Sequence, residues 1–249
     1  MKTALHLLAG LLLIICAFVV LLIFSALCVD KDKVYEKDST FYRFLMNAVV
    51  SCVILCCRIR IHVSGREKIP QSSRFVLVGN HVSNFDPIVQ LYVLRDFRLA
   101  FVSKEENLRL PIVGRIIRRC CTLAIDRKDA RKAMTAITKA IELITADEVS
   151  IGIYPEGTRS KTGELLPFHN GVFKIAQKAD VPIVVAAIHG SAQVSKRAPW
   201  RRTDVYLDFV EVIPASELKG KRTDVFGERV RNSILKSENR REALKALKQ

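Results

Sequence analysis

The chain has 249 residues, 49% of them hydrophobic, and carries a formal net charge of +15 with a sequence pI near 9.7. This composition allows one domain of ordinary size with a real core, together with a membrane segment. The positive surplus attracts an anionic partner, and composition alone does not decide among nucleic acid, anionic lipid and a phosphorylated substrate.

The cysteines exclude a cysteine-based zinc site, because none of their spacings resembles one. Adjacent cysteines are also poor disulfide partners, so the sequence predicts buried thiols in a reducing compartment. The seven residues are Cys16, Cys28, Cys52, Cys56, Cys57, Cys120 and Cys121.

Residues 4–29 are almost entirely apolar, and this run is long enough to cross a bilayer as a helix. A cleaved signal peptide is the alternative. It fits poorly, because the apolar run is too long and no small-x-small cleavage site precedes Asp30. We therefore expect a membrane anchor.

A second apolar run covers residues 44–57 and is short for an independent span. It predicts either the second leg of a hairpin or an interfacial helix that lies against the first. By the positive-inside rule the rest of the chain is cytoplasmic, on the inner membrane in a bacterium. The rule applies because positive residues follow at once, namely Arg58, Arg60, Arg66 and Lys68.

From residue 58 onward, strand patterns alternate with helix patterns, which favours an α/β sheet with helices on its faces. We expect three parts: a membrane-anchoring segment over 1–57, an α/β domain over 58–218 and a basic helical tail over 219–249. The expected strands cover 59–63, 75–79, 99–103, 122–125, 149–154, 181–188 and 205–212, and the expected helices cover 86–94, 111–119, 129–145 and 170–178.

A histidine follows the buried strand 75–79, and an aspartate stands five residues after it. An imidazole near neutrality can accept a proton from a hydroxyl, and a carboxylate on its other nitrogen would orient it. Residues i and i+5 diverge on a regular helix, so His81 and Asp86 must straddle a turn. Spacing alone favours the structural alternatives, a histidine in a polar turn at the strand end and an aspartate at a helix N-cap.

Three further strand ends carry cations that suit an anionic group. Lys104 ends one strand, Arg127 follows the next, and Arg159 lies in the loop Tyr154-Pro-Glu-Gly-Thr-Arg-Ser160. In open α/β sheets, ligands bind at the carboxyl ends of the strands. A cationic pocket beside His81 is therefore a coherent prediction, although each residue alone is more typical of a surface charge than of a ligand contact.

Taken together, five blocks of the sequence resemble the glycerolipid acyltransferases that carry an H-x4-D motif, and within them those that acylate 1-acylglycerol-3-phosphate. The blocks stand in family order, with family-like gaps, from about residue 60 to residue 190. They are Asn80-His81 with Asp86, Lys104 with Pro111 and Gly114, Ile125-Asp126-Arg127, the loop 154–160, and Val181-Pro182-Ile183.

The resemblance implies a glycerol-3-phosphate acyltransferase-like α/β fold, with a mixed, largely parallel sheet flanked by helices, after the hydrophobic N-terminal helix or helix pair. It implies transfer of a fatty acyl group from acyl-CoA or acyl carrier protein to the sn-2 hydroxyl of 1-acyl-glycerol-3-phosphate, giving phosphatidic acid. No metal or cofactor is implied. In the implied roles, His81 is the general base, Asp86 orients it, Glu156, Gly157, Thr158 and Arg159 shape the acceptor site, and Lys104 and Arg127 assist in binding phosphate.

Other readings remain open at this stage. Within the family, the alternative acceptors are another lysophospholipid, glycerol-3-phosphate or another lipid. A membrane-anchored protein that only binds anionic lipid belongs to a different class. A nucleic-acid binder is disfavoured, because the basic residues lack interleaved aromatics and a helix-turn-helix pattern. The segment Pro199-Trp-Arg-Arg202 and the basic tail suit anionic headgroups and a solvated surface equally well.

Overall fold

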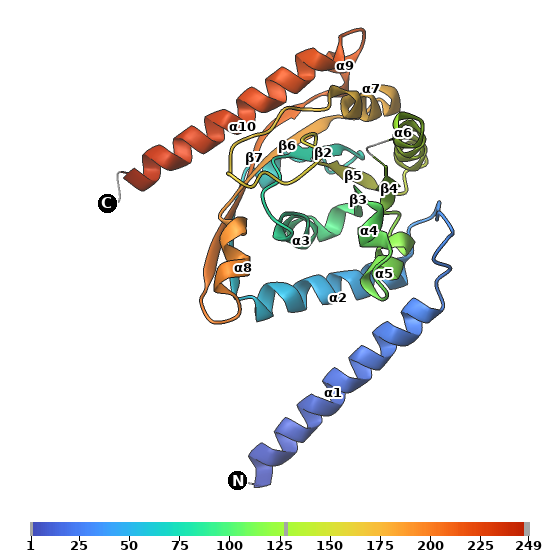
Figure 1. Ribbon diagram of the computed structural model, residues 1–249, viewed down its shortest axis with the longest axis vertical. Helices are drawn as coiled ribbons and strands as arrows, with labels where there is room; N and C mark the ends of the chain where they lie inside the picture. Colours follow the sequence, from blue (N-terminus) through green and yellow to red (C-terminus); the bar gives the residue numbers. More distant parts are fainter. Residues whose placement is uncertain (1, 127–128, 247–249) are drawn as a thin grey trace.

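A seven-stranded sheet forms the centre of the chain, in the order β1-β7-β6-β2-β5-β3-β4 (Figure 1). The computed structural model describes residues 2–126 and 129–246. Neighbouring strands run parallel except β6 and β7, which are antiparallel. This confirms the expected mixed, largely parallel sheet. Its strands are β1 (Ile59–Ser64), β2 (Val76–Gly79), β3 (Leu99–Lys104), β4 (Leu123–Ile125), β5 (Ser150–Ile153), β6 (Ile183–His189) and β7 (Thr203–Ile213).

Helices cover both faces of this sheet, which explains why β6 is an unbroken apolar run. Its side chains alternate: Ile183 and Val185 belong to one core cluster, whereas Val184 and Ala186 belong to the other. The first face carries α6 (Ala130–Thr145), α7 (Lys174–Ala179) and α10 (Thr223–Ala246), and the second carries α2 (Thr40–Cys56), α3 (Phe85–Val93) and α8 (Val194–Arg197).

The basic tail is part of the folded domain. Phe226, Val230 and Ile234 of α10 recur every four residues and are buried in the first core cluster. Farther along α10, Arg241 donates two hydrogen bonds to the carboxylate of Asp208 in β7, at 2.6 and 2.7 Å. The division of the chain at residue 218 stays a prediction.

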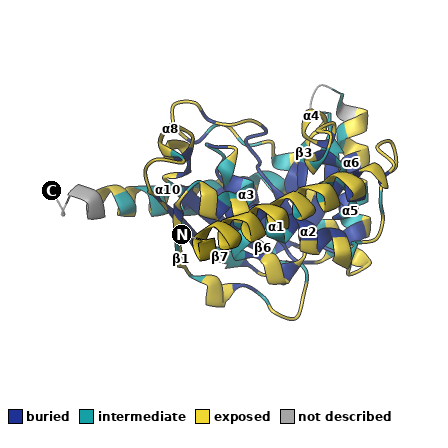
Figure 2. Ribbon diagram, turned by 90° about the horizontal axis from the view of Figure 1, so that it is seen from below, coloured by how far each residue is buried: buried dark blue, intermediate teal, exposed yellow. Residues whose placement is uncertain are grey.

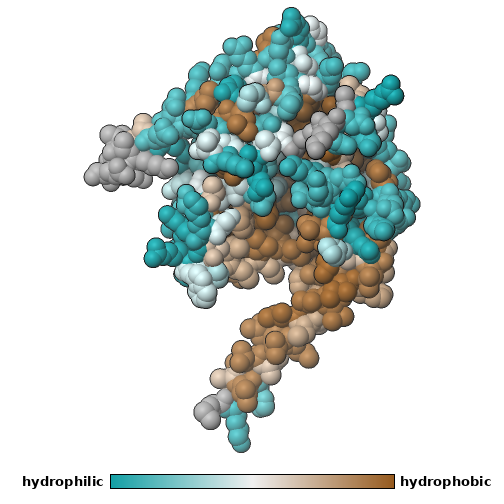
Figure 3. All heavy atoms as spheres, in the orientation of Figure 1, coloured by the Kyte–Doolittle hydropathy of each residue, from teal (hydrophilic) through white to brown (hydrophobic). Residues whose placement is uncertain are grey.

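The N-terminal helix α1 (Lys2–Leu27) is long and apolar enough to cross a membrane by length and composition. It points away from the domain and is exposed along most of its length (Figure 2). Apolar surface gathers along α1 and on the adjoining side of the domain (Figure 3). Only the C-terminal part of α1 meets the domain, where Tyr42 donates a hydrogen bond to the carbonyl of Ser25 at 2.9 Å.

Helix α2 is fixed to the domain, packing against α3, α5 (Val113–Arg119) and β1. The buried Arg43 forms an ion pair with Asp38 at 2.6 Å and donates to the carbonyl oxygens of Leu99 and Cys120. Packing of this segment on the domain was not expected from the sequence, and the two predicted roles, a second leg of a hairpin or an interfacial helix against the first, stay predictions.

The prediction of buried thiols is wrong for four of the seven cysteines. Cys120 and Cys121 are buried, and Cys57 is half-buried. The apolar runs of the first two helices are core segments only in part, because α2 buries one face and most of α1 points away from the domain. Their outer faces carry the exposed Cys16, Cys52 and Cys56, and the exposed Cys28 follows α1 directly.

Candidate active site

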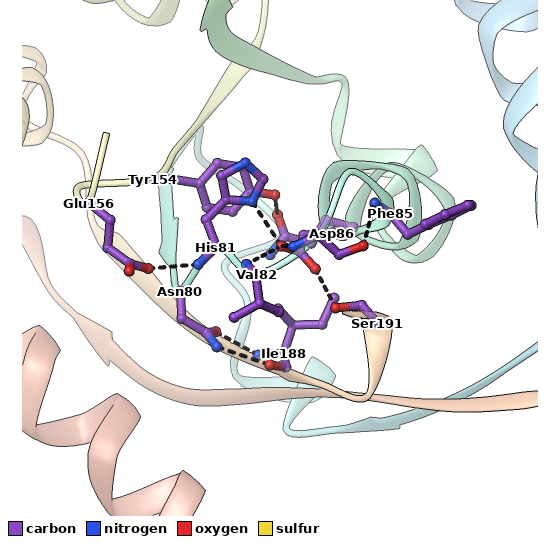
Figure 4. A network of polar contacts seen from close by, with 11 residues as sticks. Asn80, His81, Val82, Phe85, Asp86, Tyr154, Glu156, Ile188 and Ser191 are labelled. Atoms are coloured by element: carbon purple, nitrogen blue, oxygen red, sulfur yellow. Dashed lines mark hydrogen bonds and ion pairs between the residues drawn. The ribbon is translucent and has the colours of Figure 1, made fainter. Parts of the chain in front are cut away.

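The candidate site lies where the parallel strands β2, β5 and β3 end side by side. His81 follows β2 by two residues, and Asp86 lies in the first turn of α3. The chain bends sharply between them, so that His81 Nδ1 and Asp86 Oδ2 lie 2.8 Å apart (Figure 4). The predicted meeting of the two side chains across a turn is confirmed, and their catalytic roles stay a prediction.

Asp86 is completely buried and accepts four hydrogen bonds. Its Oδ2 accepts from the backbone amides of Val82 and Ser83 as well as from His81, while Oδ1 accepts from the hydroxyl of Ser191 at 2.5 Å. The carboxylate therefore organises the turn and orients the imidazole at once. The reading of Asp86 as a helix N-cap is wrong, because α3 begins at Phe85 and its N-cap is Asn84.

An aromatic stack fixes the plane of the imidazole. The rings of His81 and Tyr154 are stacked with centroids 4.1 Å apart, and Phe101 also stacks on Tyr154 at 5.5 Å. Burial raises the pKa of Tyr154 well above its usual range, so its hydroxyl stays protonated and donates to Gln90 at 2.9 Å. Gly152 in β5 makes room for this stack, because a Cβ there would lie 2.5 Å from Cε1 of Phe101.

The loop after β5 holds the backbone of His81 from both sides. Glu156 Oε1 accepts from the amide of His81 at 2.7 Å, and the amide of Ser160 donates to the carbonyl of His81 at 2.8 Å. Glu156 Oε2 accepts from the amide of Leu166. Burial raises the pKa of Glu156, and the two amide hydrogen bonds oppose that rise. Glu156 is thus a buried bridge between loop and histidine.

Gly157 serves the same loop through its backbone. It is buried, has a φ of +71°, and its amide closes a turn onto the carbonyl of Tyr154 at 3.0 Å. A positive φ favours glycine, which accounts for the residue at this bend. Neither Glu156 nor Gly157 lines the cavity described next, whereas Thr158 and Arg159 both do.

A cavity of about 740 Å³ opens beside His81. Its polar end carries His81, Lys104, Thr158 and Arg159. The rest is a long apolar wall built mainly by α1, α2, α3 and α5, and includes Leu22, Met46, Val50, Val53, Leu91, Val113 and Ile116. The cavity therefore joins a titratable group to a space that accepts hydrocarbon.

The two cations at the polar end are exposed and, in the described part of the chain, neither is engaged in an ion pair or a side-chain hydrogen bond. Lys104 ends β3 and Arg159 follows β5, the strand beside it, as the strand-end pattern predicted. Arg127, the third predicted cation, lies outside the described residues. The structure thus brings Lys104 and Arg159 to one cavity with His81.

Four residues of the site were not singled out for a role from the sequence. Ser191 bonds Asp86, Tyr154 stacks on His81, and Gln90 receives the Tyr154 hydroxyl. Asn80 joins the ends of β2 and β6 by exchanging two hydrogen bonds with the backbone of Ile188, at 2.8 and 3.0 Å. Ser191 follows the end of β6, so the same strand-end rule that pointed to Lys104 would have found it.

Cys120 and Cys121 do not line the cavity. Burial raises the pKa of each thiol to about 12, which keeps both protonated near neutral pH. Because the thiolate is the nucleophile, these two residues are unsuited to form a covalent acyl intermediate.

Comparison with known proteins gives consistent results. A family model described as Acyltransferase matches residues 60–189. The 1-acyl-sn-glycerol-3-phosphate acyltransferase of Borreliella burgdorferi is 32% identical over 149 residues, which is 59% of this chain and 58% of that protein. The human 1-acyl-sn-glycerol-3-phosphate acyltransferase alpha is 28% identical over 179 residues, covering 71% of this chain and 63% of that one.

Among solved structures, the crystal structure of the 1-acyl-sn-glycerophosphate (LPA) acyltransferase PlsC from Thermotoga maritima shares the fold. Its TM-score is 0.62 at 24% identity, covering 79% of this chain and 81% of that one. The chain spans about three fifths of the length of the two curated relatives. The matched segment of 60–189 contains His81, Asp86 and the loop around Arg159 and exceeds half of the chain. This chain belongs to the acyltransferase family.

Proposed function

We propose that this protein transfers a fatty acyl group from an acyl thioester to the sn-2 hydroxyl of 1-acyl-glycerol-3-phosphate, with phosphatidic acid as the product. One observation carries the proposal. The imidazole of His81, held by a buried carboxylate, stands where a long apolar cavity meets Lys104 and Arg159, two cations without an ion-pair partner among the described residues. The names of the two curated relatives point to the same acceptor.

The route of the proton follows from the hydrogen bonds of His81. With Nδ1–H donating to Asp86, the lone pair of the neutral ring lies on Nε2. Nε2 accepts the proton of the sn-2 hydroxyl as that oxygen attacks the thioester carbonyl carbon. The tetrahedral intermediate then collapses, the carbon–sulfur bond breaks, and the imidazolium returns its proton to the departing thiolate. Asp86 stabilises the imidazolium meanwhile.

The two ends of the cavity suit the two ends of a lysophospholipid. Lys104 and Arg159 supply positive charge for the phosphate, and an arginine can grip a phosphate through two parallel hydrogen bonds. The apolar wall suits the acyl chains. Glu156, expected from the resemblance to shape the acceptor site, would contribute by positioning His81 and the loop that carries Arg159.

Membrane association fits the same reaction, because acceptor and product are both lipids. We propose that α1 anchors the chain in the bilayer and that the domain lies on the cytoplasmic face, as the cations after α2 indicate. The acyl donor is proposed to be acyl-CoA or acyl carrier protein, used as a co-substrate without a metal or other cofactor.

The test is acyl transfer by the purified full-length protein in detergent micelles, with both donors and with lysophosphatidate, glycerol-3-phosphate and lysophosphatidylcholine as acceptors. Turnover should be highest with lysophosphatidate, and His81→Ala should abolish it while leaving the circular dichroism spectrum unchanged. Arg159→Ala should raise the KM for lysophosphatidate more than the KM for the donor. Equal turnover by wild type and His81→Ala would overturn the proposal.

A further inference from the structure

A second cavity, of about 610 Å³, lies where α2 ends and β1 and β7 begin. Arg58, Arg60 and Arg202 line it, and its apolar wall includes Ile54 and Leu55 of α2. The parallel pairing of β1 with β7 places the three arginines together, because Ile59 is the register partner of Thr203. None of the residues around this cavity lines the cavity at His81.

The positive charge of this arginine pocket is not neutralised within the described part of the chain. No ion pair joins a carboxylate to Arg58, Arg60 or Arg202 in residues 2–126 and 129–246. Asp204 interacts electrostatically with Arg60 and Arg202, but its carboxylate is hydrogen-bonded to His62 Nε2 at 2.7 Å. The exposed Lys196, Arg197 and Arg201 add further positive charge nearby in the chain.

The backbone of an exposed tryptophan is hydrogen-bonded to one of the pocket arginines. Arg58 donates to the carbonyl of Trp200 at 3.0 Å, and the Trp200 side chain is 84% exposed. Leu55, in the pocket wall, is 78% exposed. An exposed tryptophan beside arginines is the side-chain combination typical of a membrane–water interface. In Figure 1, α8 and the C-terminal end of α2 lie on the side of the domain from which α1 projects.

We infer that the pocket of Arg58, Arg60 and Arg202 binds the headgroup phosphate of an anionic membrane phospholipid that is not the substrate, with the Trp200 ring in the interface. Guanidinium groups pair with phosphate in two parallel hydrogen bonds. The inference rests on the proposed membrane association. It adds a second membrane attachment, at the C-terminal end of α2. With α1 and this end both attached, the wall of the His81 cavity that α2 forms lies along the bilayer.

Trp200 is the single tryptophan of the chain, so its fluorescence reports on this pocket alone. The full-length protein is reconstituted into phosphatidylcholine vesicles and into mixed phosphatidylcholine–phosphatidylglycerol vesicles. We expect a blue-shifted emission and quenching by brominated acyl chains in the mixed vesicles only. Each arginine near an anionic surface strengthens binding about fivefold, so the variant with Arg58→Gln, Arg60→Gln and Arg202→Gln should weaken the local contact about a hundredfold and lose both signals.

The matched control removes the same charge from the opposite face of the sheet, with Lys174→Gln, Lys178→Gln and Arg240→Gln; these residues are exposed on α7 and α10. It should behave like wild type. Equal Trp200 emission in both vesicle types, or a triple-arginine variant that matches the control, would overturn the inference. So would the same spectral change caused by inorganic phosphate without vesicles, since the pocket would then take a soluble anion.

Acyl transfer in detergent micelles separates this inference from the proposed function. The triple-arginine variant should retain wild-type turnover there, because the pocket shares no residue with the cavity at His81. A loss of turnover confined to that variant would place the arginines in the catalytic site and overturn the inference. Absence of turnover in wild type as well, with the Trp200 response intact, would count against the proposed function alone.

Discussion

Replacing Asp86 with asparagine separates the charge of this residue from its shape. Three donors meet at Oδ2, namely His81 Nδ1 and the amides of Val82 and Ser83. In the variant the amide oxygen takes that position, and the new NH2 group faces the hydroxyl of Ser191, which can turn and accept. All four hydrogen bonds survive, so we expect the fold to be retained.

Asp86→Asn removes the electrostatic attraction between the carboxylate and the imidazolium that it contacts. Two unit charges about 4 Å apart interact by about 4 kcal/mol at an effective dielectric constant of about 20. Because about 1.4 kcal/mol corresponds to a factor of ten in rate, Asp86→Asn should lower kcat by about 10³-fold. The KM for either substrate should change little, because Asp86 is buried and does not line the cavity.

The assay is steady-state acyl transfer to lysophosphatidate in micelles, with thermal unfolding of each variant measured in parallel. Ser191→Ala is the matched control, since it removes one hydrogen bond to Asp86 but keeps the negative charge. We expect it to lower kcat by no more than about tenfold, the equivalent of one hydrogen bond. A folded Asp86→Asn variant with more than a tenth of wild-type kcat would refute the electrostatic reasoning.

Three further predictions concern other contacts. Glu156→Gln turns an NH2 group toward one of two backbone amides, so kcat should fall about tenfold because His81 loses its fixed position; unchanged steady-state kinetics would contradict this. Arg43→Met leaves Asp38 buried without its partner, and the free energy of unfolding by urea should fall by about 3–5 kcal/mol, whereas a loss below about 1 kcal/mol would count against it. Burial acts to raise the pKa of Asp208, but hydrogen bonds from its arginine and serine partners hold this pKa below the usual value. Asp208 therefore stabilises the fold above a pH of about 4 and loses that effect as the pH falls through its lowered pKa. Asp208→Asn should be less stable than wild type by about 1–3 kcal/mol at neutral pH and equal to it in acid. A stability difference that is the same at both pH values would argue against this.

The fold was predictable where the sequence pattern depends on burial alone. The apolar run of 181–188 marks a strand covered on both faces, and β6 (Ile183–His189) occupies that place. Helix periodicity over 129–145 likewise corresponds to α6. The short α4 (Glu105–Leu108) and α8 were not anticipated, because one turn of helix is too short to show a hydrophobic period.

The site was predictable only as far as each strand end could be recognised separately. The meeting of His81 with Asp86 is local in sequence, whereas Ser191 reaches Asp86 from 105 positions away because β6 lies beside β2. Strand order is not written in any local pattern. A carboxylate in a sequence also does not reveal its partners, which is why Glu156 was assigned to the acceptor site although it bonds two backbone amides.

Gly152 influences the position of His81 through the rings of Phe101 and Tyr154. A methyl group at that position would displace Phe101, and the stack would transmit the movement to Tyr154 and then to His81. The distance from Nε2 to a bound hydroxyl would change although no residue of the cavity wall had been replaced by another type. Under the proposed function, side-chain volume inside β5 therefore tunes the rate of proton transfer by way of the position of the His81 ring.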